Sequence, residues 1–178
     1  MPSDITKTYS DKELIQKISE SSESAFKSLF TQYYNSLVKF CFYRIRNLEA
    51  SKDLVQEVFT NLWISRNRLD PEKSIKAYLY RSVVNQIINL KKHSSSQNIS
   101  FDESISTKEN SKLSNLENQI DIFSSIDKLP DKLKTVFLLS RVEGFKYSEI
   151  AEICEISVKA VEKRMTQTFK KLRKSLTR

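Results

Sequence analysis

The stretch DLVQEVFTNLW, residues 53–63, carries apolar residues in adjacent pairs that recur about every four positions. This spacing predicts an amphipathic helix with one buried face. The apolar residues are Leu54, Val55, Val58, Phe59, Leu62 and Trp63. The opposite face consists of Asp53, Gln56, Glu57 and Asn61. It holds two carboxylates and no cation in a basic chain, so we interpret it as a surface for a partner, with an ordinary solvated face as the alternative.

The composition around this stretch predicts an all-α protein. The chain has 178 residues but only 1 Gly and 3 Pro, so few residues interrupt helices. Hydrophobic residues make up 39% of it, which suffices for modest cores but not for one large core. We therefore expect two small helical modules.

Three parts follow one another along the chain. Residues 11–93 have helical periodicity, with a loop expected near 66–74 because Pro71 cannot extend a running helix. Residues 94–117 are rich in serine and carry net negative charge, which is typical of a flexible linker. Residues 118–178 return to helical periodicity, with helices expected at about 118–128 and 131–143, the second ended by Gly144.

The C-terminal part contains the pattern of a helix-turn-helix. Ser148 and Ser157 are each placed to cap a helix, and only Glu155 and Ile156 lie between the two helices. Glu155 stands where glycine is usual, so the turn needs either a strained residue or another design. The residues expected to close its core are Ile150, Cys154, Ile156, Val158, Val161 and Met165. A helical hairpin that serves only for packing is the alternative.

The charge of the chain favours a polyanionic partner. The formal net charge is +8, and residues 158–178 hold eight cations and one acid. Taken alone, this segment could be a solvated terminal helix. As the second element of a helix-turn-helix it becomes a candidate for binding DNA.

The sequence offers little for catalysis or metal binding. It has one histidine, His93, and the two cysteines, Cys41 and Cys154, lie far apart without partners at metal-ligand spacing. No glycine-rich phosphate loop exists in a chain with one Gly. We therefore predict no catalytic residue, no metal and no cofactor. The absence of a signal peptide or an apolar span predicts a cytoplasmic location.

Two blocks of the sequence resemble bacterial RNA polymerase sigma factors of the sigma-70 family. The block FKSLFTQYYNSLVKFCFYRIRNLEASKDLVQEVFTNLW, followed by IKAYLYRSVVNQIINLKK, is similar to sigma region 2. The block LPDKLKTVFLLSRVEGFKYSEIAEICEISVKAVEKRMTQTFKKLR is similar to region 4. Together the blocks cover about residues 23–93 and 120–176, and region 3 is absent. This plan resembles the extracytoplasmic-function (ECF) group.

The resemblance implies a role for each surface. In this family the helix at 53–63 docks on core RNA polymerase, so Asp53, Gln56, Glu57 and Asn61 would face the polymerase. The N-terminal module would capture the melted minus-10 element through Arg68, Lys73, Lys76, Arg81 and Asn85. The C-terminal module would read the minus-35 duplex through Lys159, Lys163, Arg164, Thr166, Gln167, Lys170 and Lys171. Sigma factors of this group are commonly held inactive by an anti-sigma factor, which becomes a further expected partner.

Two other interpretations remain at this stage. A stand-alone helix-turn-helix regulator would need neither the acidic face at 53–63 nor a module for melted DNA. A pure interaction protein would bind polymerase without binding DNA. Glu162 departs from the family, where a basic residue is common, so the base sequence that is read cannot be predicted. Tyr78 and Tyr80 are predicted to pack rather than to stack on bases.

Overall fold

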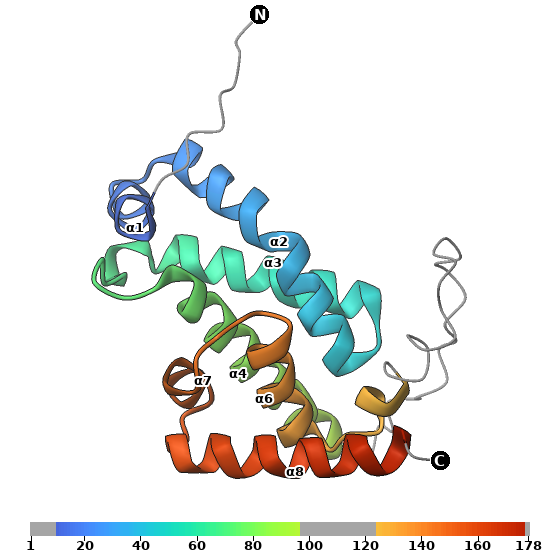
Figure 1. Ribbon diagram of the computed structural model, residues 1–178. Coiled ribbons are helices and arrows are strands. Elements are labelled where there is room, and N and C mark those ends of the chain that lie inside the picture. Colours follow the sequence, from blue (N-terminus) through green and yellow to red (C-terminus); the bar gives the residue numbers. More distant parts are fainter. Residues whose placement is uncertain (1–9, 97–123, 177–178) are drawn as a thin grey trace, which may run out of the picture. The chain divides into compact units, whose positions relative to one another are not determined.

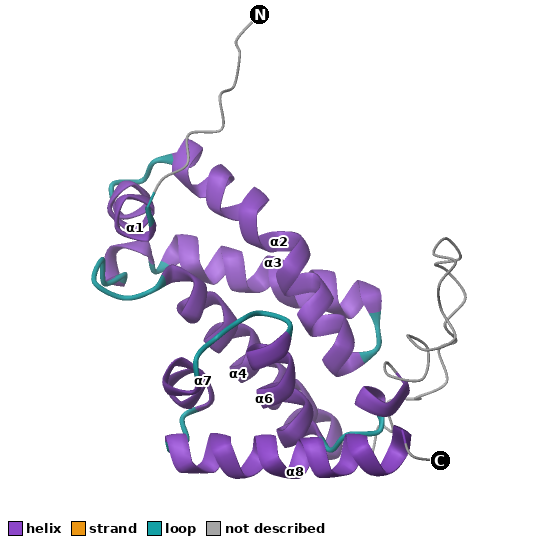
Figure 2. Cartoon of the chain, in the orientation of Figure 1, coloured by secondary structure: helices purple, strands orange, loops and turns teal. Residues whose placement is uncertain are grey.

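The computed structural model of the chain describes residues 10–96 and 124–176 (Figure 1). Within these two ranges every regular element is a helix, which confirms the predicted all-α class (Figure 2). The described residues form two compact units, one in each range, and each is considered separately below.

The N-terminal unit consists of four α-helices and one short 3-10 helix. They are α1 (Asp11–Ser19), α2 (Glu23–Ile45), α3 (Leu48–Ile64), η1 (Arg66–Arg68) and α4 (Ile75–Ser96). Side chains at Ser10, Ser22 and Asn47 cap the first three helices by accepting from backbone N–H groups of the first turn. The loop predicted near 66–74 begins with the helical turn η1 and extends to the start of α4.

The core of this unit is built from the apolar stripes that the sequence indicates. On α3 the stripe is buried as predicted except at Trp63, which is half-buried. On α4 the buried residues are Ile75, Leu79, Tyr80, Val83, Val84 and Ile87. Phe40 of α2 meets Tyr80 edge to face, with 5.3 Å between ring centroids. The first half of α4 is therefore packed into the core of the unit, with Tyr80 against α2.

A left-handed residue makes the turn between α2 and α3. Arg46 has φ 54° and its backbone N–H donates to Phe42 O, ending α2, and Asn47 at once caps α3. The Arg46 guanidinium carbon lies 5.5 Å from the Phe42 ring centroid and 5.7 Å from that of Tyr43. These cation–π contacts help to hold an arginine in a conformation that favours glycine.

The C-terminal unit contains α6 (Asp131–Arg141), α7 (Tyr147–Cys154) and α8 (Val158–Leu176). The helix predicted over 131–143 ends two residues early, at Arg141 with Val142 as its C-cap, and Gly144 (φ 77°) makes the turn that follows, where Phe145 N donates back to Leu139 O. Ser157 caps α8 by accepting from Ala160 N. The prediction that Ser148 caps α7 is wrong: α7 begins one residue before it, and the Glu149 carboxylate accepts from Lys146 N instead.

The turn between α7 and α8 keeps the helix-turn-helix spacing without glycine. Glu155 adopts the left-handed conformation, φ 54° and ψ 46°, and its N–H donates back to α7 carbonyls. The structure thus uses the first of the two predicted alternatives, a strained residue at the usual glycine position.

The core of this turn differs in part from the prediction. Ile150, Val161 and Met165 are buried as expected, whereas Val158 is 41% exposed. Ile153 of α7 is also buried and was not among the predicted core residues. Periodicity indicates the side of a helix that packs but not where along its length packing starts, and Val158 is the first residue of α8.

Two predicted segments lie mostly outside the described residues. The serine-rich linker was expected from residue 94, and α4 continues to Ser96 before the undescribed range begins. Of the helix expected at 118–128, only the end is described, where residues 124–127 form a helical turn. Lys134 of α6, which is buried, donates to Asp127 O at 2.8 Å and so ties this turn to α6.

Candidate protein and nucleic-acid interfaces

The polar residues of α3 lie together on its exposed face. Asp53, Gln56, Glu57 and Asn61 are all exposed, while the apolar residues between them are buried. Neither Asp53 nor Glu57 forms an ion pair within the described ranges. The neighbouring cation, Lys52, donates to Glu49 at 2.8 Å instead. The face therefore presents two carboxylates and two amides to solvent.

Aromatic rings fix the orientation of this face. Phe59 lies 4.8 Å from Phe30 and 6.1 Å from Phe26 by ring centroids, both on α2. Trp63 lies between Phe26, at 4.9 Å, and the Arg66 guanidinium, at 4.6 Å. Because large side chains pack on the inner side of α3, the helix cannot rotate its polar side inward without losing these contacts.

One exposed residue on this face was not predicted. Ile64 ends α3 and is 71% exposed, the most exposed large hydrophobic side chain in the described part of the chain. It lies three residues after Asn61 and seven after Glu57, a spacing that keeps it on the same side of the helix. The periodicity of residues 53–63 stops one residue short of it, so only its exposure identifies it.

On α4 the candidate DNA residues do not form one surface. Arg81 and Asn85 are exposed and four residues apart, so they share a face. Lys76 lies five residues before Arg81, which places it about 140° around the helix. It is half-buried, with Nζ 6.0 Å from the Tyr80 ring centroid. The structure therefore brings Arg81 and Asn85 together and separates Lys76 from them.

The two tyrosines of α4 differ in their environments. Tyr80 is fully buried, as the packing prediction requires. Tyr78 is 36% exposed, so the prediction that it packs is wrong in part. Tyr78 precedes Arg81 by three residues and Asn85 by seven, which puts its ring on the same face as both. An aromatic residue beside a cation and an amide is a combination that suits an unstacked base.

The loop before α4 carries Arg68 and Lys73, and both are exposed. Arg68 ends η1, whereas Lys73 lies in the turn that follows, with Nζ 4.0 Å from Asp70 Oδ2. Ser74 caps α4 by accepting from Ala77 N at 3.3 Å. Both cations therefore stand on the segment that leads directly into the Arg81 and Asn85 face.

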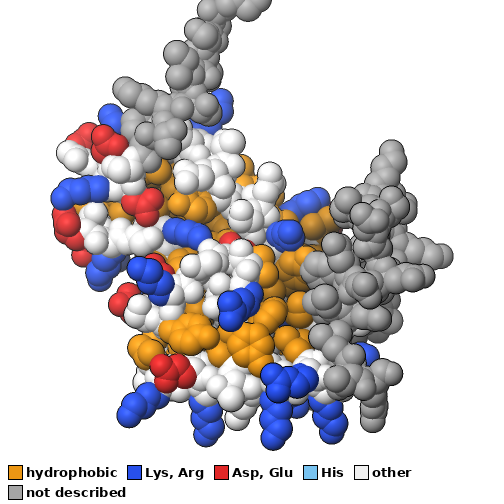
Figure 3. All heavy atoms as spheres, viewed as in Figure 1, with side chains coloured by type: hydrophobic (Ala, Val, Ile, Leu, Met, Phe, Trp, Pro, Cys, Tyr) orange, Lys and Arg blue, Asp and Glu red, His pale blue; other side chains and the backbone are white. Residues whose placement is uncertain are grey.

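The outer side of α8 is strongly basic. Lys159, Lys163, Thr166 and Lys170 follow one another at spacings of four, three and four residues, so they form one exposed row. Figure 3 shows Lys and Arg side chains projecting side by side along the edge formed by α8. Gln167 is exposed beside this row, four residues after Lys163. Such a row suits contact with DNA phosphates and base edges.

The other candidates on α8 lie at the flanks of this row. Arg164 is half-buried and Lys171 is exposed, and each directly follows a member of the row, which puts it about 100° around the axis. Thr166 donates to Glu162 O at 3.0 Å, so its hydroxyl oxygen is left as an acceptor. Arg173 and Lys174, which the candidate set did not include, are exposed and extend the basic surface toward the end of α8.

Several other features bear on function. Burial raises the pKa of the Cys41 thiol to about 12, which leaves it protonated and unreactive at neutral pH. Among the described residues, no three His, Cys, Asp or Glu side chains gather in a way that could hold a metal ion. None of the helices described here combines the length and the apolar character needed to cross a membrane.

Family comparisons match both units. The family described as "Sigma-70 region 2" matches residues 29–96, and the family described as "Sigma-70, region 4" matches residues 120–172. The first match covers α3, α4 and most of α2, and the second covers α6, α7 and most of α8.

Similar proteins and structures agree with these matches. The chain is 24% identical over 180 residues to "ECF RNA polymerase sigma factor SigW" of Bacillus subtilis, with 93% of this chain and 96% of the relative covered. It is 27% identical over 170 residues to "ECF RNA polymerase sigma-E factor" of Haemophilus influenzae, covering 87% and 89%. The fold resembles that of sigma factor RpoE solved with anti-sigma factor NepR from Bartonella quintana, with TM-score 0.73, 21% identity and coverage of 85% and 96%. It also resembles CnrH solved with the cytosolic domain of CnrY, with TM-score 0.72, 21% identity and coverage of 94% and 97%.

Proposed function

Because the chain belongs to the sigma-70 family, as an ECF-group RNA polymerase sigma factor that acts in transcription initiation, we propose that the exposed face of α3 binds core polymerase. The observation that carries this proposal is the exposure of Asp53, Gln56, Glu57 and Asn61 together on one side of α3. Carboxylates without ion pairs can meet cations of a partner and are repelled by DNA phosphate. Ile64 adds an apolar contact at the end of the same face.

We further propose that α8 reads the minus-35 element as duplex. The exposed row of Lys159, Lys163, Thr166 and Lys170 enters the major groove, with Gln167 beside it. Lys163 favours guanine and Gln167 favours adenine, while Arg164, Lys159, Lys170 and Lys171 mostly hold phosphates. The capped first turn of α8 supports this orientation, because it fixes the end of the helix that leads into the groove.

The N-terminal unit is proposed to bind the minus-10 element as melted strand. Asn85 and Arg81 form a surface for the base edge and the backbone, and Arg68 and Lys73 approach from the loop. Lys76 is proposed as a peripheral phosphate contact, because it lies on another side of α4. The working domains are then residues 11–93 and 118–178, joined by the linker at 94–117.

An anti-sigma factor is the proposed regulatory partner. Two of the similar structures were solved as complexes, one with an anti-sigma factor and one with the cytosolic domain of a second protein. In each unit of this chain, apolar residues remain exposed beside the candidate surfaces: Ile64 and Ile88 in the first, Val142 and Phe169 in the second. A partner that covers these residues would also block the polar surfaces next to them.

Reconstituted transcription tests the proposal. The protein is added to sigma-free core polymerase from its own organism, on genomic fragments that include its own upstream region, and start sites are mapped. Discrete new start sites are expected with the wild-type protein, and Glu57→Lys should abolish most of them because it places a cation where the partner is expected to be cationic.

The control for this variant is Glu23→Lys, which makes the same change of charge at an exposed position in the first turn of α2. It should leave start sites and core binding unchanged. If the wild-type protein bound duplex DNA tightly but produced no start sites and did not bind core, a stand-alone regulator would replace this proposal.

A further inference from the structure

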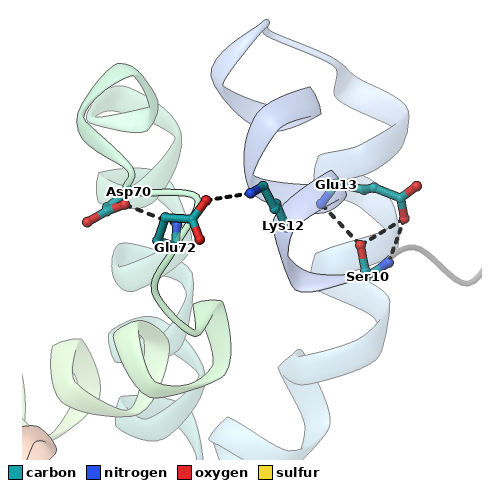
Figure 4. Close-up of polar contacts among 5 residues, drawn as sticks. All are labelled: Ser10, Lys12, Glu13, Asp70 and Glu72. Atoms are coloured by element: carbon teal, nitrogen blue, oxygen red, sulfur yellow. Dashed lines mark hydrogen bonds and ion pairs between the residues drawn. The ribbon is translucent and has the colours of Figure 1, made fainter.

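Helix α1 makes polar contacts with the loop that joins α3 to α4, residues 65–74, which includes η1, and Figure 4 shows part of them. Lys12 Nζ donates to the Glu72 carboxylate, 60 positions away in the sequence. Ser74 Oγ donates to Asp11 Oδ2 at 3.3 Å. Glu72 and Ser74 both lie between η1 and the first turn of α4. The two contacts therefore hold the C-terminal end of the loop.

The opposite end of the loop is held from the turn after α1. Arg66 Nε donates to Ser21 Oγ at 3.0 Å, and Arg66 Nη1 donates to Trp63 O at 2.8 Å. Ser21 links α1 to α2 and has φ 66°, a left-handed conformation. Contacts from one helix and its following turn therefore reach both ends of the loop.

The loop also has its own internal order. The Asp70 side chain accepts from Glu72 N at 3.0 Å, and Asp70 O accepts from Lys73 N at 3.1 Å, which closes a tight turn (Figure 4). This turn directs Glu72 toward α1, where it meets Lys12. The hydrogen bond and the charge of Glu72 raise the pKa of Lys12, so Lys12 stays cationic at neutral pH.

We propose that α1 positions the 65–74 loop for reading the melted minus-10 strand, through the contacts Lys12–Glu72, Asp11–Ser74 and Ser21–Arg66. This inference rests on the proposed function, in which the loop carries Arg68 and Lys73 to the DNA. The match to sigma region 2 begins at residue 29, after α1, so the positioning role belongs to a part of the chain outside the matched region.

The physical reason is the geometry that base capture requires. An extruded base is recognised by hydrogen bonds that tolerate deviations of only some tenths of an ångström, so the supporting segment must be held in place. A loop tied only at its two ends, to α3 and to α4, would sample several conformations. Ties to α1 restrict these conformations before DNA arrives, which lowers the ordering cost of binding.

The first measurement follows the loop without DNA. Amide hydrogen exchange in the full-length protein is compared for wild type, Lys12→Glu, Glu72→Lys and the double variant with both changes. Each single variant should speed exchange in the loop about two- to fivefold, because it removes an exposed ion pair and creates repulsion. The double variant should restore the wild-type rate, since it rebuilds the pair with its charges exchanged.

The second measurement uses holoenzyme with each variant and fluorescent single strands that carry the minus-10 sequence of a mapped start site. Affinity is measured for the matched strand and for strands with one base changed at each position. Lys12→Glu should lower the ratio of matched to mismatched affinity about two- to fivefold, and the double variant should restore it. Lys12→Glu alters no residue of the loop, so a direct effect on DNA contacts is avoided.

The matched control is Lys27→Glu, an equal change of charge at an exposed position of α2. It should change neither loop exchange nor the affinity ratio, and core binding should be the same for all variants. Melting temperatures of all variants establish that each is folded.

The outcomes separate this inference from the function on which it rests. Unchanged loop exchange in Lys12→Glu would refute the role of α1, whatever the protein binds. Faster exchange with an unchanged affinity ratio would also refute it, because the loop would then need no positioning. A wild-type holoenzyme that does not distinguish any strand would refute minus-10 reading itself, and the positioning role with it.

Discussion

Helices α3 and α8 solve the same folding problem and present opposite surfaces. They have 17 and 19 residues, and each buries an apolar stripe against its own unit. The exposed side of α3 carries Asp53 and Glu57, whereas that of α8 carries a row of lysines. The difference teaches that the buried positions determine how a helix packs and the exposed positions determine what it can bind. The carboxylates of α3 therefore suit a cationic partner surface, whereas the lysines of α8 suit a polyanion.

The turns that precede these helices show a second parallel. Arg46 precedes α3 and Glu155 precedes α8, and both are left-handed with φ 54°. Arg46 is half-buried and lies against two aromatic rings, whereas Glu155 is exposed. The same backbone conformation therefore occurs at a half-buried residue in one turn and at an exposed residue in the other.

The largest effect is expected from breaking the buried side of α3. Phe59→Ala should destabilise the N-terminal unit by about 3–5 kcal/mol, because it removes a buried ring that contacts Phe26 and Phe30. Urea denaturation followed by hydrogen exchange measures this, and amides of α8 should keep their protection. Thr60→Ala, at an exposed position one residue later, serves as the control. Equal loss of protection in both units would show that the two helices do not fold independently.

Reversing one exposed charge on α3 or on α8 should weaken binding to one partner and leave binding to the other unchanged. Glu57→Lys is expected to weaken binding to core polymerase about tenfold or more while leaving duplex affinity unchanged. Lys163→Glu should do the opposite, lowering affinity for a minus-35 duplex and sparing core binding. Biosensor binding to core and fluorescence anisotropy with DNA give the two affinities. A variant that lowered both equally would contradict the division of labour between α3 and α8.

Lys170 and Gln167, which lie three residues apart on α8, should contribute differently to DNA binding. Lys170→Ala is expected to lower affinity a few-fold for all duplexes and to reduce the slope of log affinity against log salt by about 1. Gln167→Ala should leave that slope unchanged and reduce discrimination between minus-35 sequences. Titrations at several salt concentrations with matched and altered duplexes distinguish the two. Identical salt slopes for both variants would argue that Lys170 does not contact a phosphate.

The smallest effect concerns the two left-handed turns. Glu155→Gly should stabilise the C-terminal unit by about 0.5–1 kcal/mol, because relief of the left-handed conformation exceeds the added entropy of the unfolded chain. Arg46→Gly should give no such gain, since it removes the contacts with Phe42 and Tyr43. Thermal melting of each variant checks the difference. A gain at Arg46 as large as that at Glu155 would show that those ring contacts contribute little.

The sequence was sufficient for the buried stripes and insufficient for details that depend on neighbours. The apolar pairs of residues 53–63 and the spacing of Ile75, Leu79 and Val83 predicted the packing sides, because helical periodicity is local. The predicted cap at Ser148 was wrong because α7 begins at Tyr147, which places Ser148 inside the first turn of the helix. Val158 and Tyr78 were predicted to pack but are 41% and 36% exposed, because periodicity does not show how far packing extends along a helix or around it.

The candidate binding residues are a different case. The four residues on α3 and the row on α8 could be placed on the correct helices from spacing alone, and their binding roles remain predictions. Lys76 was grouped with Arg81 and Asn85 by charge, and the helix separates them. The contacts of α1 with the loop could not be predicted, because they join residues about 60 positions apart that share no local pattern.

The long separation of Lys12 and Glu72 also determines when in folding their contact can form. Closing a chain segment of this length costs about 3–4 kcal/mol of entropy, far more than an exposed ion pair returns. The contact must therefore form late, after the packing of α2, α3 and α4 has already brought α1 to the loop. The loop therefore reaches its final geometry only when folding of the N-terminal unit is complete. A chain with only part of its N-terminal core formed would not yet hold the segment that is proposed to read DNA.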